Sequence, residues 1–240
     1  GPPVIAARDV WMSFPGKRDG ERIAVLERVS IDVHAGEFVC LVGPSGCGKS
    51  TLLNIIAGFM SATRGEVIVE GSPVRGPDPR RIFVFQENGV FPWLNVRDNI
   101  GFGLSRKPAE ERRRIVDHSI GMVGLTGFDA AYPRELSGGM RQRVEIARAL
   151  AANPDIIYMD EPFCALDFIT RMKMRADLTR IWQAEKKTIL FVTHDIEEAV
   201  QLADRVLVMS RRPATIQREF RIDLPRPRDL DSPGYLRARD

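Results

Sequence analysis

A glycine-rich stretch near the start of the chain has the residues needed to hold phosphate groups. Residues 43–50 fit the pattern G-x-x-x-x-G-K-[ST], between an apolar run at 37–42 and a helical pattern that opens near Lys49. Glycines let backbone N–H groups point at phosphate oxygens, and a helix start adds a positive dipole end. We expect Lys49 to contact the β- and γ-phosphates of a nucleoside triphosphate, and the Ser50 hydroxyl to bind Mg²⁺. The residues predicted to hold the phosphates are Gly43, Pro44, Ser45, Gly46, Cys47, Gly48, Lys49, Ser50 and Thr51.

Two neighbouring carboxylates follow another apolar run, at residues 156–159. Asp160 fits the role of holding Mg²⁺, directly or through water. Glu161 fits a general base that orients and deprotonates an attacking water. The alternative, a polar loop start without chemistry, is weak in a chain that also carries a phosphate loop.

A second potential anion site lies further along the chain. Ser137, Gly138 and Gly139 precede a long amphipathic helical pattern, which makes another helix start able to bind an anion. One nucleotide does not need two such sites 88 positions apart, from Lys49 to Ser137. Two chains arranged head to tail would use both, with each γ-phosphate held by the loop of one subunit and the Ser137 site of the other.

The stretch 136–143, Leu-Ser-Gly-Gly-Met-Arg-Gln-Arg, resembles the signature sequence of the ABC ATPase family. The resemblance extends from about Val4 to Met209 with the motifs in the family's order, and it implies ATP as the ligand. It implies that His194, after an apolar run, contacts the γ-phosphate and links it to Glu161. A loop at 165–167 is expected to cross the dimer interface.

Two further residues take roles from this resemblance. Gln86 follows the apolar run 82–85 and matches the loop glutamine that reaches Mg²⁺ and the attacking water. Phe14 fits the aromatic that stacks on adenine, although Trp11 lies nearby and an aromatic near a strand end is usually core.

Composition is that of a soluble globular chain. Its 240 residues are 44% hydrophobic and 28% charged, and the net charge is +3, too small to argue for a nucleic-acid partner. No apolar stretch is long enough for a membrane span, and the first residues do not resemble a signal peptide. The three cysteines and three histidines have neither disulfide-framework nor metal-ligand spacing.

The pattern of elements predicts an α/β fold with a P-loop NTPase core. Apolar runs that predict strands lie at 37–42, 67–70, 82–85, 156–159, 188–192 and 206–209. Helical patterns between them, at 52–58, 140–151 and 195–203, indicate a mainly parallel sheet covered on both faces. Runs at 4–10, 23–33 and 67–70, with turn residues Pro15-Gly16 and Asp19-Gly20, predict an N-terminal antiparallel β portion.

One ABC ATPase domain is predicted over residues 1–240. Its RecA-like core with the β portion takes about 4–87 and 141–210, and an inserted helical subdomain takes about 88–140. A helix opening at Pro108 belongs to this subdomain, with Ile115, Ile120 and Val123 as core candidates. Residues 211–240 are predicted to be a solvated, arginine-rich C-terminal tail, or alternatively a surface facing anionic lipid or a partner.

Three details resemble the nitrate, sulfonate and taurine importers of this family. They are residues 91–96 (Phe-Pro-Trp-Leu-Asn-Val), Pro162-Phe163 before the 165–167 loop, and Leu-Pro-Arg-Pro-Arg at 224–228. Cys164 departs from the glycine or serine expected at its position. An independent chain of this length favours an importer over an exporter, whose cassette is usually fused to its membrane domain. An exporter or another cargo, or a non-transport ABC ATPase, are the alternatives.

The resemblance also implies partners and a location. A second copy of the chain, or a related ATPase, would complete the dimer. A permease helix would dock on a groove formed by Gln86 and residues 90–96, using Phe91, Trp93 and Leu94, unless these aromatics are subdomain core. A solute-binding protein would join through the complex. The chain would then lie at the cytoplasmic face of the membrane.

Cys47 lies inside the phosphate loop at a helix start, a position that favours thiolate. One interpretation is that a maleimide blocks ATP binding there and that ATP protects the thiol. The other is a small residue shielded by its own loop.

Overall fold

The computed structural model describes residues 1–18, 20–86, 89–228 and 232–239. Six strands form its larger sheet in the order β10-β9-β3-β8-β7-β6, and all neighbours pair in parallel except β9 and β10. The prediction of a mainly parallel sheet is therefore confirmed. The strands are β3 (Phe38–Val42), β6 (Ile82–Val84), β7 (Ile156–Asp160), β8 (Thr188–Thr193), β9 (Arg205–Met209) and β10 (Ile216–Arg221).

The three central strands of this sheet are continuous apolar runs because both of their faces are covered. Every residue of β3, β7 and β8 is buried. Such runs are typical of parallel strands packed between layers, where no face meets water. The observed strands begin or end within one residue of the predicted runs at 37–42, 82–85, 156–159 and 188–192.

The N-terminal β portion is a separate antiparallel sheet in the order β2-β1-β4-β5. Its strands are β1 (Ile5–Pro15), β2 (Arg22–Val33), β4 (Arg64–Val69) and β5 (Ser72–Pro73). A Gly16 N–H to Glu21 carbonyl bond closes the predicted β1–β2 turn, while Asp19 lies outside the described residues. Apolar residues of this sheet pack with α1 (Lys49–Ala57) and one face of the larger sheet, in a cluster that contains Val10, Leu41 and Leu52.

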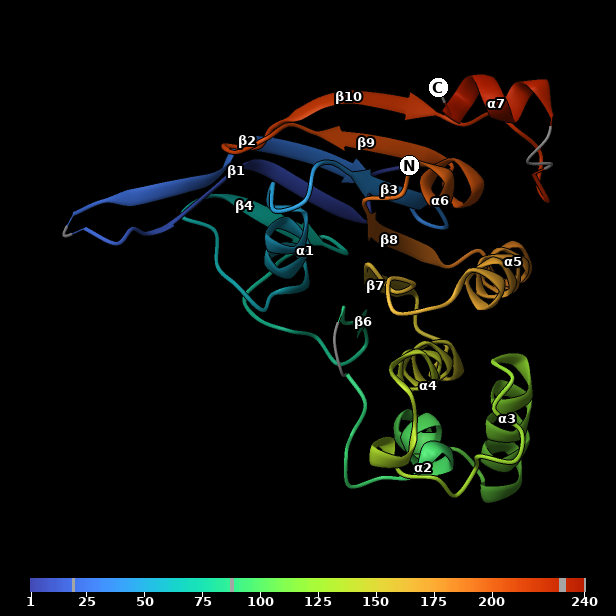
Figure 1. Cartoon of the computed structure of the whole chain (residues 1–240). Helices are drawn as coiled ribbons and strands as arrows, with labels where there is room; N and C mark the ends of the chain where they lie inside the picture. The colour runs from blue at the N-terminus through green and yellow to red at the C-terminus, as the bar shows by residue number, and fades with distance from the viewer. Residues whose placement is uncertain (19, 87–88, 229–231, 240) are drawn as a thin grey trace.

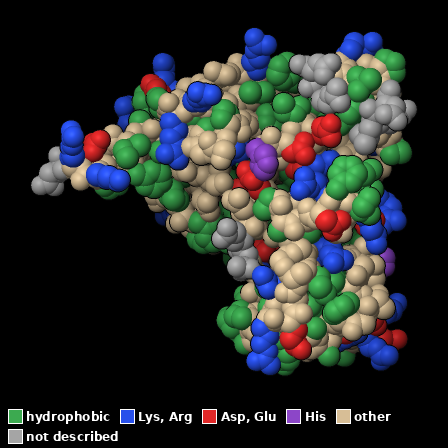
Figure 2. All heavy atoms as spheres, viewed as in Figure 1, with side chains coloured by type: hydrophobic (Ala, Val, Ile, Leu, Met, Phe, Trp, Pro, Cys, Tyr) green, Lys and Arg blue, Asp and Glu red, His purple; other side chains and the backbone are tan. Residues whose placement is uncertain are grey.

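Three helices gather at one end of the molecule, away from the antiparallel sheet (Figure 1). They are α2 (Val96–Gly101), α3 (Ala109–Met122) and α4 (Gly138–Ala151), with 3-10 turns at Phe102–Leu104 and Pro133–Glu135. Figure 2 shows this end projecting below the rest, with Lys and Arg side chains interspersed with Asp and Glu over the face in view. Of the predicted subdomain limits, 88 lies outside the described residues and 140 falls inside α4, which packs on α2, α3 and β6.

The C-terminal part forms regular structure, although many of its residues are exposed, as the prediction of a solvated tail expects for Arg211, Arg218 and Arg221. β10 pairs with β9, and α7 (Pro233–Arg239) packs on α6 (Ile196–Leu202). Arg226 pairs with Asp204 at 2.7 Å and lies over the Trp182 ring of α5 (Phe168–Glu185), and Arg228 donates to the Val200 carbonyl. The last carbonyls of a helix lack partners within it, and these guanidinium groups supply the missing donors.

Candidate functional site

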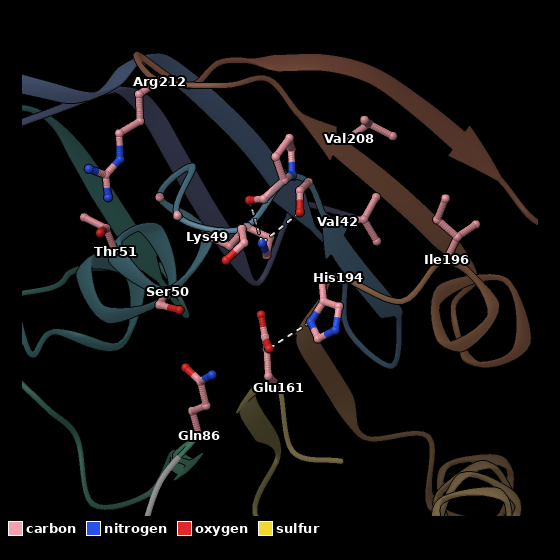
Figure 3. A pocket seen from close by; sticks show the side chains of 15 residues that line it. Val42, Lys49, Ser50, Thr51, Gln86, Glu161, His194, Ile196, Val208 and Arg212 are labelled. Carbon is pink, nitrogen blue, oxygen red and sulfur yellow. Dashed lines mark hydrogen bonds and ion pairs between the residues drawn. The ribbon is translucent and has the colours of Figure 1, made fainter. Parts of the chain in front are cut away.

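Four loops that leave the larger sheet at one edge surround a cavity of about 790 Å³. Since β3, β6, β7 and β8 run in parallel, their carboxyl ends lie at that same edge, where open α/β sheets bind ligands. Gln86, Glu161 and His194 extend into the cavity opposite the phosphate loop (Figure 3). The predicted residues that line it are Gly43, Pro44, Ser45, Gly46, Gly48, Lys49, Ser50, Thr51, Gln86, Glu161 and His194.

The phosphate loop takes a backbone path that only glycine follows without strain. Gly48 has φ 122°, and a Cβ there would also lie 2.9 Å from the Val25 side chain. No side chain caps α1 at Gly48, so its first-turn N–H groups face the cavity. The Lys49 ammonium donates to the carbonyls of Gly43 and Pro44 at 2.8 and 3.1 Å. The loop thus holds the Lys49 ammonium beside its backbone N–H groups, and together these groups could bind a polyphosphate.

Ser50 lines the cavity, and it meets the buried Asp160, which does not line it, although 110 residues separate the two in sequence. The Ser50 hydroxyl donates to Asp160 at 3.0 Å. Burial raises the pKa of Asp160 above its usual 3.8, the Ser50 hydrogen bond and Lys49 oppose the rise, and Glu161 adds to it. A hydroxyl and a carboxylate side by side are hard oxygen ligands of the kind that Mg²⁺ prefers, so the two residues fit the predicted metal role.

Glu161 sits directly after β7 in an unusual backbone conformation. Its φ is 44°, in the left-handed region, and its N–H donates to the Val192 carbonyl of β8. The carboxylate lies 2.9 Å from Nδ1 of His194 (Figure 3). Strained backbone of this kind clusters at functional sites, where surrounding contacts maintain it. The geometry brings together the predicted base and the histidine that the family resemblance links to it.

A buried ionic network holds the segment that carries His194. Asp195 caps α6 by accepting from the N–H groups of Glu197 and Glu198. Arg175 of α5 binds the carboxylates of Asp195 and Glu198 at 2.8 Å each. The other oxygen of Glu198 accepts from the Thr193 hydroxyl at 2.6 Å. Because these groups satisfy one another, the β8–α6 turn is fixed, and the exposed imidazole is aimed at Glu161.

Arg212 lines the same cavity and was not predicted to do so. Its guanidinium extends toward Thr51 from the β9–β10 turn (Figure 3), and no other described residue forms an ion pair with it. The sequence places it among several arginines near the C-terminal end, so nothing in its spacing distinguishes it. Ile196, Val42 and Val208 add apolar walls to the cavity.

The Ser137 site lies elsewhere in the same chain. Ser137 caps α4 by accepting from the Met140 N–H at 3.2 Å, and Ser137 and Gly138 are exposed. A Cβ on Gly139 would lie 3.2 Å from the Ala165 carbonyl, so the 165–167 loop passes close beneath it. None of residues 137–139 lines the cavity, which agrees with a site that faces outward to another chain.

The predictions for Phe14 and Cys47 have different outcomes. Phe14 packs against the core cluster between the sheets and is not among the residues that line the cavity, so its stacking role stays a prediction. Cys47 is only 2% exposed, and its sulfur lies beneath the loop near Gly43. The structure therefore supports the shielded thiol, because the side chain points into the core cluster instead of the cavity.

A phosphate loop, an adjacent carboxylate pair and a histidine facing one cavity define a nucleoside triphosphatase. The family model for "ABC transporter" matches residues 26–164. A nitrate import ATP-binding protein from Synechocystis sp. is 50% identical over 219 residues, covering 90% of this chain and 82% of the relative. A taurine import ATP-binding protein from Roseobacter denitrificans is 47% identical over 206 residues, covering 85% and 77%.

The fold is also that of a solved cassette. The dimeric post-hydrolysis state of an ATP-binding cassette, bound to ADP and Pi, superposes with a TM-score of 0.81 at 34% identity. The alignment covers 92% of this chain and 100% of that one. The chain belongs to the ABC transporter family, and it is an ATP-binding and ATP-hydrolysing cassette.

Proposed function

We propose that this cassette powers the import of a small solute that is or carries an oxyanion, through a separate permease. The observation that carries the proposal is the hydrolytic site on a chain similar to nitrate and taurine import subunits. Lys49, Ser50, Glu161 and His194 line one cavity, and Asp160 bonds to Ser50 from behind it. Nitrate and the sulfonate group of taurine are both small oxyanions. An oxyanion of this size is therefore the solute class we assign.

The chain's own residues divide the work of hydrolysis. The phosphate-loop N–H groups and Lys49 bind the β- and γ-phosphates, and Ser50 and Asp160 would hold Mg²⁺, which neutralises charge developing on the transferred phosphoryl group. Glu161 orients the attacking water and accepts its proton. His194, at 2.9 Å from Glu161, keeps that carboxylate facing the γ-phosphate. Gln86, which lines the cavity on the same side as Glu161, would reach the same water.

Each cavity is completed by a second copy of the chain or a related ATPase. The helix start at Ser137 supports this arrangement, because its N–H groups could bind an anion but residues 137–139 do not line the cavity of their own chain. The similar cassette of known structure is a dimer. ATP would then hold two subunits together, and hydrolysis would release them.

The permease would dock at residues 90–96, beside an apolar groove of about 440 Å³ whose lining includes Phe91. Gln86, Trp93 and Leu94, which were also predicted to form the docking groove, do not line it. Phe91 stacks on Trp93 with ring centroids 5.4 Å apart, and Trp93 is 68% exposed. Exposed aromatics beside a groove suit a short helix from a partner. No helix in the described part of the chain is long and apolar enough to cross a membrane. We assign a peripheral position at the cytoplasmic face, held by this permease contact and reached by a solute-binding protein through the complex.

An uptake assay tests the proposal. Cells that lack the gene should fail to accumulate nitrate or an aliphatic sulfonate, and the wild-type chain should restore uptake. Glu161→Gln should not restore it, although the protein is present. Normal uptake of both oxyanions in the deletion strain, with transport of another solute lost, would contradict the assignment.

A further inference from the structure

Side chains on one face of α4 form hydrogen bonds with the backbone at both ends of the glutamine loop, residues 85–89. Gln142, Glu145 and Arg148 are spaced three residues apart, so their side chains leave the helix on neighbouring turns of one face. Each bonds to Phe85 or Gly89, the described residues at the two ends of this loop.

Glu145 supplies the two central bonds. One carboxylate oxygen accepts from the Phe85 N–H at 2.7 Å, and the other accepts from the Gly89 N–H at 3.0 Å. Only 1% of the residue is exposed. Because each oxygen serves a different end of the loop, the carboxylate fixes the distance between those ends, which a single hydrogen bond could not do.

Two neighbours complete the contact. Gln142 donates to the Phe85 carbonyl at 3.3 Å, and Arg148 donates to the Gly89 carbonyl at 2.5 Å. The N–H and the carbonyl at both ends are therefore satisfied by α4 side chains. Arg148 also lies over the Phe91 ring, 4.5 Å from its centroid, so the same helix reaches the proposed permease groove.

Gly89 is packed so closely on Glu145 that a larger residue would have to displace the carboxylate. A Cβ on Gly89 would lie 2.0 Å from one carboxylate oxygen and 2.3 Å from the carboxyl carbon. Burial raises the pKa of Glu145 above 4.5, and the Phe85 N–H and Arg148 oppose that rise. A buried carboxylate is costly unless its oxygens are fully bonded, and here two N–H groups and a nearby guanidinium compensate for it.

We propose that Glu145 is a positioning residue for ATP hydrolysis: it holds both ends of the glutamine loop so that Gln86 stays directed into the nucleotide cavity. It acts through Gln86 and does not touch ATP. Since Ser137 caps the N-terminus of α4, one helix then connects the Ser137 site to Gln86 and to the permease groove. The proposal rests on the hydrolytic role assigned to Gln86 under the proposed function.

The isosteric variant Glu145→Gln replaces one acceptor oxygen by an NH₂ group, which cannot accept from Phe85 or Gly89. In the full chain we expect kcat for ATP to fall about 10- to 100-fold, as for other small displacements of catalytic groups. The KM for ATP should change less than about threefold, because the phosphate loop is untouched. A kcat within twofold of wild type would overturn the proposal.

A double variant separates positioning from general damage. If Glu145 acts through Gln86, then Gln86→Ala combined with E145Q should be no slower than Gln86→Ala alone. Losses that multiply would show that Glu145 acts independently of Gln86, which overturns the proposal. Gln86→Ala with wild-type kcat would instead refute the role of Gln86 in the proposed function.

Two more variants control for stability and contact. Val116→Ala removes buried methyl groups from α3 and leaves the α4 contacts to Phe85 and Gly89 in place, so it should lower Tm while leaving kcat unchanged. If it lowers kcat as much as E145Q does, helical stability explains the effect and the proposal fails. In the wild-type background, Gly89→Ala should lower kcat because the added methyl group displaces the Glu145 carboxylate. In the Glu145→Ala background the carboxylate is absent, so Gly89→Ala should cause no further loss of kcat. A further loss in that background would contradict the proposed contact.

Discussion

Replacing Glu161 by glutamine should stop turnover without weakening ATP binding. The substitution keeps the side chain's size and its position beside Nδ1 of His194, 2.9 Å away, but removes the group that accepts the water proton. General-base catalysis contributes about 10²–10⁴-fold, so kcat should fall by that factor, equivalent to about 3–5 kcal/mol in the activation barrier. ATP affinity should stay within about threefold, because Lys49 and the loop N–H groups bind the phosphates.

Phosphate release under saturating ATP measures the first expectation, and equilibrium binding of ATP measures the second. Glu111→Gln is a matched control, since Glu111 is a partly exposed carboxylate in the first turn of α3, paired with Lys107 just before that helix. It should hydrolyse ATP at the wild-type rate. A Glu161→Gln chain that turns over within threefold of wild type would refute the assignment of the base, and one that loses ATP binding would show that Glu161 serves binding instead.

Three other perturbations test separate parts of the structure. Burial raises the pKa of Asp160, so its ionised form destabilises the nucleotide-free fold; this destabilisation is absent below the unfolded pKa, about 3.9, and appears as the pH rises through the folded value. Asp160→Asn should therefore unfold at a higher temperature than wild type at neutral pH, with the gap closing toward pH 4, and a lower Tm at pH 7 would contradict this. Maleimide should modify exposed Cys164 in the folded chain and buried Cys47 only after unfolding, as peptide mass mapping would show; labelling of Cys47 before unfolding would mean that the loop opens. Arg228→Ala should lower the free energy of unfolding by about 1–3 kcal/mol in denaturant titrations, because the α6 carbonyl at Val200 loses a charged donor, whereas exposed Arg218→Ala should not; equal losses would rule out that role.

The hydrolytic half of the site could be predicted from the sequence because its chemistry is local. The phosphate loop, the Asp160-Glu161 pair and the segment around His194 each directly follow an apolar strand, and parallel strands bring their carboxyl ends together. The strand ends therefore determine where these residues lie. Gln86 obeys the same rule at the end of β6.

Other features depend on contacts that spacing does not reveal. The arginines at 226 and 228 resemble a solvated tail in the sequence, but carbonyls at the end of α6 and the Trp182 ring give them partners. Arg212 reaches the cavity only because β10 folds back on β9. Glu145 faces Phe85 across 60 residues, and an acidic residue in a helix otherwise suggests solvent exposure.

The central claim, that one chain supplies half of each ATP site, is tested most directly by mixing two inactive variants. Lys49→Ala removes the loop cation, and Ser137→Arg blocks the helix start offered to the partner. Neither should hydrolyse ATP alone, because every site in either homodimer carries one defect. A mixed dimer contains one site with both defects and one intact site, so random mixing of equal amounts should recover about a quarter of the wild-type rate. A mixture no more active than the mean of its two components would contradict the shared site.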